Sequence, residues 1–197
     1  MTRFYHLLLS LLLTSVVAAI PCVSAQAQSR TTAKPAATKS TPKGTAAASD
    51  SPVLLGQFGD WGVYQATPGG KKVCFALAKP ASAVTDPPGR NRDEPYLFVS
   101  TRPAENVKNE ISVIVGYPQK PNVDATATVG SANYALYTQN DGAWIRNAAD
   151  EAQMIDAMRK GSEVVVKSIS THGTKTTDTY SLKGISQALD KVAEACK

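Results

Sequence analysis

Three residues near the C-terminal end of the sequence carry the groups of a nucleophilic triad: Ser170, His172 and Asp178. A hydroxyl, an imidazole and a carboxylate can together activate the hydroxyl oxygen for attack on a carbonyl group. However, no Gly-x-Ser-x-Gly motif surrounds Ser170, and the pair His172-Gly173 is typical of a turn between two strands. We therefore interpret His172 as an exposed turn residue and predict that the protein is not an enzyme.

Acidic residues raise a second catalytic alternative, a hydrolase with paired carboxylates, but nothing in their spacing pairs them. We expect Asp60 to lie in a turn, Glu110 to pair with Arg102, and Asp178 to be partly buried and bonded to neighbouring threonine hydroxyls. Outside the first 27 residues His172 is the only histidine, and no acidic loop could bind calcium. The sequence therefore predicts no metal site and no cofactor.

The cysteines favour a structural role over a chemical one. Cys22 lies in an N-terminal segment that we expect to be removed, which leaves Cys74 and Cys196. Two cysteines in an exported protein predict a disulfide bond between them. Free buried thiols and a reactive cysteine are the alternatives, and the latter lacks the nearby second thiol of a Cys-x-x-Cys pair.

The N-terminal segment has the layout of a secretory signal peptide. Residues 1–27 contain Arg3, an apolar run of fourteen residues that is short for a membrane span, and small residues suited to cleavage after Ala25 or Ala27. A lipid anchor on Cys22 is the alternative, but Pro21 fits such a processing site poorly. We predict a periplasmic or secreted protein with no transmembrane segment after cleavage.

Residues 28–52 are rich in Ala, Thr, Ser, Lys and Pro and contain no aromatic residue. Such a composition predicts a disordered tether. The net charge of +5 is concentrated before the folded part, because residues 53–197 contain 16 basic and 15 acidic residues. A nucleic-acid-binding domain needs a concentrated basic face, so we expect no nucleic-acid partner.

Residues 53–197 are enough for one domain, and most of their apolar residues alternate with polar ones, which is typical of strands. Helical spacing is confined to residues 147–160, followed by Gly161, and to residues 185–196, where Cys196 should point inward. The fold class that we predict is mainly β: an antiparallel β-sandwich with two short peripheral α-helices. The strands are expected within residues 58–80, 96–99, 111–117, 123–129, 134–137, 143–145, 162–170 and 174–182.

Two segments are the best candidates for a binding surface. Residues 80–95 contain four prolines and mixed charge, and we expect an exposed loop; residues 168–181 form a threonine-rich hairpin. The candidate contact residues are Arg90, Arg92, Asp93, Thr174, Thr176 and Thr177. Trp61 and Trp144 are interpreted as core residues, with sugar or partner stacking as the alternative.

Short motifs along the folded part resemble the invasion-associated locus B (IalB) family of alphaproteobacterial exported proteins. In order, they are Phe58-Gly-Asp-Trp-Gly-Val, Val73-Cys74-Phe75, Lys79-Pro80, Ser100-Thr-Arg-Pro103, Asn109-Glu-Ile-Ser-Val113, Gly116-Tyr-Pro118, Gly142-Ala-Trp-Ile145, Met158-Arg-Lys-Gly161 and Thr176-Thr-Asp-Thr-Tyr-Ser-Leu-Lys-Gly184. The chain departs from the family pattern at His172, where an arginine is expected.

The resemblance implies a periplasmic or surface-exposed, mainly β domain without recognised cofactors or catalytic residues. We therefore expect a non-enzymatic interaction protein that binds a host or envelope partner. The alternative is a periplasmic accessory protein that binds a small ligand or a glycan.

Overall fold

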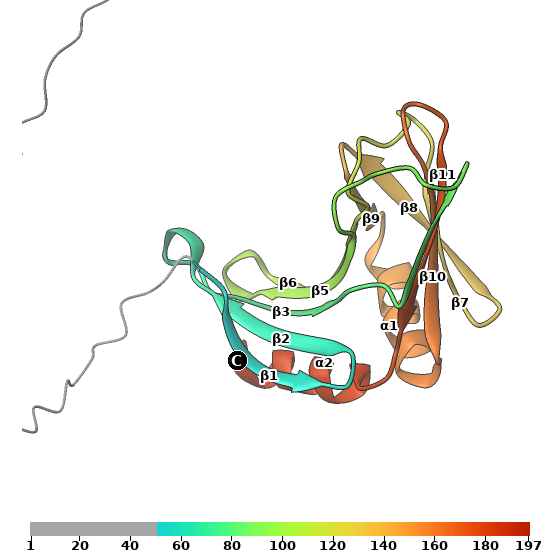
Figure 1. Cartoon of the computed structure of the whole chain (residues 1–197). Helices are drawn as coiled ribbons and strands as arrows, with labels where there is room; N and C mark the ends of the chain where they lie inside the picture. The colour runs from blue at the N-terminus through green and yellow to red at the C-terminus, as the bar shows by residue number, and fades with distance from the viewer. Residues whose placement is uncertain (1–50) are drawn as a thin grey trace, which may run out of the picture. The chain divides into compact units, whose positions relative to one another are not determined.

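Eleven antiparallel strands form one hydrogen-bonded sheet in the computed structural model of the protein, which describes residues 51–197 (Figure 1). The predicted signal peptide and all but the last two residues of the predicted tether lie outside the described residues. The strands are β1 (Val53–Phe58), β2 (Trp61–Ala66), β3 (Val73–Ala78), β4 (Ser82–Asp86), β5 (Tyr96–Arg102), β6 (Val107–Ile114), β7 (Ala125–Val129), β8 (Ala132–Gln139), β9 (Gly142–Ile145), β10 (Glu163–Ile169) and β11 (Lys175–Ser181). The helices are α1 (Ala148–Lys160), α2 (Ile185–Ala195) and two 3-10 turns, η1 (Pro68–Gly70) and η2 (Pro103–Glu105).

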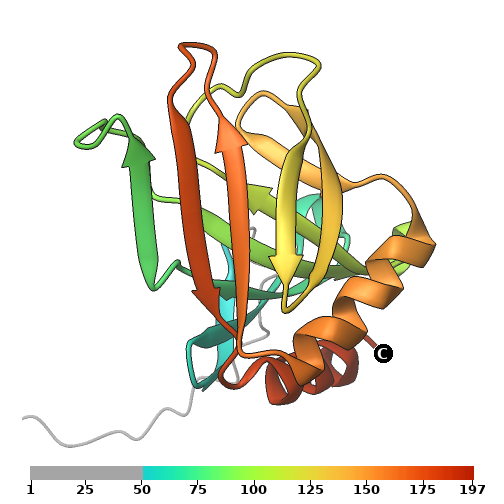
Figure 2. The same ribbon diagram turned by 90° about the vertical axis from the view of Figure 1, so that its right-hand side faces the viewer.

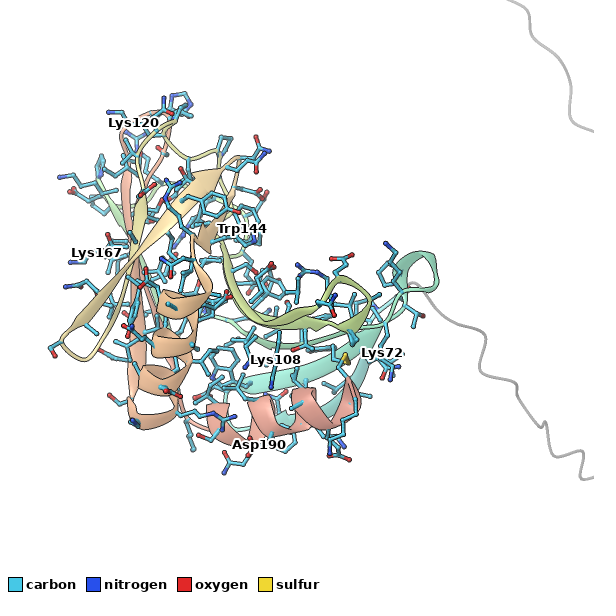
Figure 3. All side chains as sticks on the ribbon, turned by 180° about the vertical axis from the view of Figure 1, so that it is seen from behind. Lys72, Lys108, Lys120, Trp144, Lys167 and Asp190 are labelled. Carbon is cyan, nitrogen blue, oxygen red and sulfur yellow. A yellow bond between two sulfur atoms is a disulfide. The ribbon has the colours of Figure 1, made fainter. Side chains whose placement is uncertain are left out.

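The strand order is β1-β2-β3-β5-β6-β9-β8-β7-β10-β11-β4. This confirms the mainly β class with two short helices. The strands are not divided into two separate sheets, however, because β6 pairs with β9 from Ser112 to Ile114. The sheet instead bends steeply where these two strands meet. One part of the sheet, made of β1, β2, β3, β5 and β6, therefore runs across the other part, made of β9, β8, β7, β10, β11 and β4 (Figures 1 and 3).

The core lies on one face of the sheet, because buried and partly exposed residues alternate along the strands. Leu97 and Val99 of β5 and Val164 and Val166 of β10 are buried, whereas the residues between them are partly exposed. The same alternation along the other strands makes a single buried cluster.

Both predicted helices are present and cover this core. Helix α2 packs against β1, β2, β3 and β5, and α1 packs against β6 to β9 (Figure 1). Asn147 caps α1 by accepting a hydrogen bond from the backbone N–H of Asp150 at 2.8 Å, and Gly161 follows the last turn. Within residues 51–197 no helix is both long enough and apolar enough to span a membrane.

Residues 80–95 are mostly exposed, as expected, but the expectation that they form a loop is wrong for part of the segment. This segment contains β4, which pairs with β11 from Ser82 to Asp86 and forms an edge of the sheet (Figure 2). Strand β1, at the other edge, was also not expected as a strand. Each edge strand pairs on one side only, so few of its residues are buried and the alternation that reveals a strand is weak.

Candidate functional site

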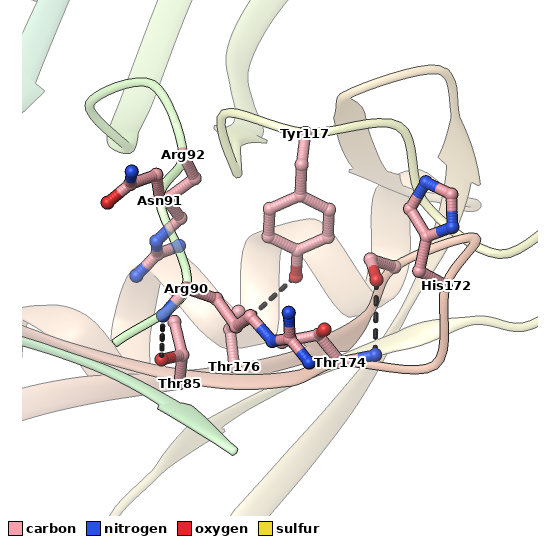
Figure 4. A pocket seen from close by; sticks show the side chains of 9 residues that line it. Thr85, Arg90, Asn91, Arg92, Tyr117, His172, Thr174 and Thr176 are labelled. Atoms are coloured by element: carbon pink, nitrogen blue, oxygen red, sulfur yellow. Dashed lines mark hydrogen bonds between the residues drawn. The ribbon is translucent and has the colours of Figure 1, made fainter. Parts of the chain in front are cut away.

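An open cleft of about 360 Å³ lies where the connection from β4 to β5 faces the tip of the β10–β11 hairpin (Figure 4). We call it the hairpin cleft. Polar side chains from both predicted segments, together with one tyrosine, line it: Thr85, Arg90, Asn91, Arg92, Tyr117, Ser170, His172, Thr174 and Thr176.

Arg92 anchors the wall that the β4–β5 connection contributes. Its guanidinium forms a two-pronged ion pair with the carboxylate of Asp178 on β11, and its Nη1 also donates to the carbonyl oxygen of Val115 at 3.1 Å. The exposed fractions of the two charged side chains are 8% and 1%. The hydrogen bond with Asp178 raises the pKa of Arg92, opposed by burial. The pair therefore holds the β4–β5 connection against β11.

Tyr117 stands beside Arg92 in the wall and is joined to the floor. Its hydroxyl group and that of Thr176 share a hydrogen bond of 2.6 Å, and the guanidinium of Arg92 lies over its ring, 6.0 Å from the centroid. The buried face of β11 carries every second residue of the strand: Thr176, Asp178 and Tyr180. The hydroxyl of Tyr180 is the only buried side-chain oxygen or nitrogen atom in residues 51–197 without a hydrogen-bond partner, and burial raises its pKa.

Gly116 allows the β4–β5 connection to approach the sheet closely. Its φ is +77°, and a Cβ atom at this position would collide with the carbonyl oxygen of Asp93. The backbone N–H of Asp93 donates to the carbonyl oxygen of Gly116 at 3.0 Å. The backbone thus holds Arg92 next to Tyr117.

The six predicted contact residues fall into three groups. Arg90 and Thr174 line the cleft with exposed or half-exposed side chains. Arg92 and Thr176 also line it, but they are engaged in the frame described above. Asp93 and Thr177 lie outside the cleft; Thr177 lines a different hollow, between β4 and β10. These six residues stay a predicted binding surface.

The triad alternative is not assembled. Ser170 Oγ accepts a hydrogen bond from the backbone N–H of Thr174 at 3.1 Å, and the Asp178 carboxylate is held by Arg92. Within residues 51–197 no hydrogen bond joins His172 to either. His172 is exposed at the hairpin turn, as predicted, but it also lines the cleft. The arginine–glutamate pair that we expected between Arg102 and Glu110 is present, with two hydrogen bonds of 2.8 and 2.9 Å.

Sequence reasoning placed Tyr117 outside both candidate segments. Tyr117 had a usable signal, because it follows Ile111, Val113 and Val115 on one face and therefore lies at the polar end of a buried row. Thr85 and Asn91 lie within the predicted segment 80–95 but were not singled out as contact residues, because their position at the cleft depends on the pairing of β4 with β11.

The predicted disulfide bond joins Cys74 of β3 to Cys196, directly after α2. The Nζ atom of Lys72 donates to the carbonyl oxygen of Ala195 at 2.9 Å beside the bond (Figure 3). The disulfide bond and this hydrogen bond hold the end of α2 against β3.

The two tryptophans differ in burial. Trp61 is fully buried and donates from Nε1 to the carbonyl oxygen of Ser181 at 3.0 Å, which confirms its place in the core. Trp144 is half-buried and stacks on Tyr137, with 5.6 Å between the ring centroids. Neither lines the hairpin cleft.

Fold and cleft together define a class: mainly β proteins with one bent antiparallel sheet, a disulfide that holds the last helix, and an open polar cleft at one end of the sheet. Residues 65–193 match the family described as "Invasion associated locus B (IalB) protein", and the chain belongs to this family. Searches of curated proteins and of solved structures find no significant match.

Proposed function

We propose that the chain is a non-enzymatic exported protein, periplasmic or secreted, that binds a host or envelope partner through the hairpin cleft and its rim. The signal-like segment at residues 1–27 supports export, and membership of the IalB family supports an invasion-associated type of protein.

The observation that carries the proposal is the construction of the cleft. Its floor is the paired strand β11, and its walls are fixed by the Arg92–Asp178 ion pair and the Tyr117–Thr176 hydrogen bond. Its rim presents to solvent the polar side chains of Arg90 and His172, which have no side-chain hydrogen bond or ion pair within residues 51–197. Binding sites gain affinity from such preorganised frames, because little conformational entropy is lost when a partner arrives.

Site-directed photocrosslinking in the producing bacterium, alone and in contact with host cells, tests this proposal. A photoreactive amino acid replaces His172 on the rim or, as the control, Gln153, which is exposed on α1. We expect an adduct of defined mass from position 172, suppressed by excess unlabelled protein, and none from position 153. Equal adducts from both positions, or none from position 172, contradict the proposal.

Export is tested separately by cell fractionation and mass measurement of the mature chain. We expect a periplasmic or released protein that begins at Gln26 or Gln28, directly after the small residues of the signal-like segment. An intact chain in the cytoplasm contradicts export, whatever the crosslinking shows.

A periplasmic accessory role in binding a small ligand or a glycan is the second candidate. It is favoured by the volume of the cleft, about 360 Å³, which lies at the lower end of the range for small-molecule sites, roughly 300–1,000 Å³.

A further inference from the structure

We propose that the hairpin cleft binds a sugar that carries a single carboxylate, such as a uronic acid, with the carboxylate on Arg90 and the sugar ring against the face of Tyr117 that Arg92 does not cover. The inference rests on the proposed function in one respect, that this cleft is a binding site. It adds the chemical class of the ligand.

The arginine in the cleft without an acidic partner in the described part of the chain is Arg90. Arg92 is neutralised by Asp178, and no aspartate or glutamate side chain lines the cleft. The guanidinium of Arg90 is exposed and forms no ion pair or side-chain hydrogen bond within residues 51–197; Figure 4 shows it extended under Tyr117 toward Thr174. A guanidinium presents its donors as a planar fork that matches a carboxylate. One unpaired cation therefore suits a ligand with one negative charge.

The hydroxyl groups of the cleft are arranged as donors. Thr85 Oγ1 accepts the backbone N–H of Arg90 at 3.3 Å, and Ser170 Oγ accepts that of Thr174 at 3.1 Å. Each hydroxyl oxygen thus already has a donor, while its own hydrogen has no acceptor in the described part of the chain. A ligand rich in acceptor oxygens, as a sugar acid is, satisfies these groups.

Tyr117 supplies the apolar surface that a sugar ring needs. One side of its ring is covered by the Arg92 guanidinium, and its hydroxyl is fixed by Thr176, so the ring cannot swing away. A held aromatic ring offers contact area at little entropic cost. The cleft volume of about 360 Å³ is suited to a ligand of about one or two sugar rings.

The proposal favours a carboxylate over a phosphate. A phosphate monoester carries about 1.5 to 2 negative charges at pH 7, and it would place excess charge against the single unpaired Arg90. A neutral sugar would offer the Arg90 guanidinium only uncharged hydroxyl oxygens, so the stronger charge-assisted hydrogen bonds to a carboxylate would be lost.

Nuclear magnetic resonance titration of the full exported chain tests the assignment with five probes. Galacturonate and glucuronate are the sugar acids, galactose is the neutral counterpart, galactose 1-phosphate carries the phosphate, and cyclohexanecarboxylate carries a carboxylate on a ring without hydroxyl groups. We expect a sugar acid to bind at least tenfold more tightly than each of the other three, with shifts centred on residues 85–92 and 170–176. Added salt should weaken this binding, because the ion pair forms at an open rim.

Two arginine substitutions identify the group that holds the carboxylate. Arg90→Gln should weaken binding of the sugar acid about tenfold or more, since a charge-assisted hydrogen bond is lost, and should leave the affinity for galactose unchanged. Arg146→Gln is the matched control: it removes the same charge from an exposed arginine that pairs with Asp124 away from the cleft, and should have no effect.

Each contrary result overturns the assignment. If galactose binds as tightly as the sugar acids, the carboxylate has no role in binding. If galactose 1-phosphate binds more tightly, the ligand carries a phosphate and not a carboxylate. If cyclohexanecarboxylate binds equally well, the sugar hydroxyl groups are not recognised. If no probe binds, the ligand class is wrong. The crosslinking experiment at position 172 is independent of these probes, so failure of the wider proposal is seen separately.

Discussion

Arg92 and Asp178, 86 positions apart in the sequence, form a two-pronged ion pair from which solvent is almost excluded. The pair joins the β4–β5 connection to the centre of β11, and it stands at the wall of the hairpin cleft. Because the charges are buried together, each depends on the other for the solvation that water no longer supplies.

Replacing Asp178 with asparagine should lower the free energy of unfolding by about 3–5 kcal/mol, because Arg92 would keep a buried and uncompensated charge. Chemical denaturation measures the loss. Asp190→Asn is the control, since Asp190 pairs with Arg159 at the surface, 2.9 Å away, and such bridges contribute about 0–1 kcal/mol. Similar losses in the two variants would show that the Arg92–Asp178 pair is not buried in solution.

Replacing both Cys74 and Cys196 with serine should lower the free energy of unfolding by about 2–5 kcal/mol, because the bond closes a loop with a sequence separation of 122. The control is Lys72→Met, which removes only the hydrogen bond to Ala195 and should cost about 1 kcal/mol. Alkylation of the unreduced mature protein checks the bond directly, and two modified thiols would contradict it.

Glu151 should make the protein less stable as the pH rises. Burial on α1 raises the pKa of its carboxyl group, helped by Glu110, while the hydrogen bond from the backbone N–H of Ile111, at 2.7 Å, and Arg102 oppose the shift. The folded state therefore binds the proton more tightly than the unfolded state does. This contribution is fully present below the ordinary glutamate pKa of about 4.3 and is lost as the pH rises through the folded pKa.

The variant Glu151→Gln checks this, because its amide oxygen can still accept the Ile111 hydrogen bond but it cannot ionise. Relative to the natural protein, the variant should gain stability as the pH rises above about 4.3 and through the folded pKa of Glu151. Denaturation at several pH values measures the difference. A difference that stays constant, or that falls as the pH rises, would show that the carboxylate is well solvated.

The two tyrosines beside the ion pair should respond to loss of the hydroxyl group in opposite directions. Tyr180→Phe removes a buried hydroxyl without a partner and should raise the free energy of unfolding by about 1 kcal/mol. Tyr117→Phe breaks the hydrogen bond with Thr176 and should lower it by about 0.5–1.5 kcal/mol. Destabilisation by Tyr180→Phe would reveal an ordered water molecule on its hydroxyl.

Much of the fold could be predicted from local patterns. The alternation of apolar and polar residues around Ile111 and Val113 predicts which side chains of the strand are buried. The helical spacing of apolar residues within 147–160 and 185–196 predicts the two helices. The pairing of Cys74 with Cys196 followed from counting, because only two cysteines lie outside the signal-like segment. These features depend on residue type and short spacing alone.

The candidate site was predicted only in part. The sequence drew attention to Arg90 and Thr174 through their exposed, polar segments, and the structure places both at one cleft. It treated Arg92 as a surface residue, because nothing local marks Arg92 as buried. It expected Asp178 to be partly buried but gave it threonine hydroxyls as partners, because Arg92 is distant in the sequence.

What the sequence by itself determined is therefore the class: a mainly β, disulfide-bonded domain with two helices. Only the tertiary structure decided that the strands form a single bent sheet, that β4 pairs with β11, and that a cleft forms between the β4–β5 connection and the tip of the β10–β11 hairpin. The physical reason is that strand pairing and buried ion pairs join residues far apart in the chain. Their register is set by all the strands packing together, and no short stretch of sequence contains it.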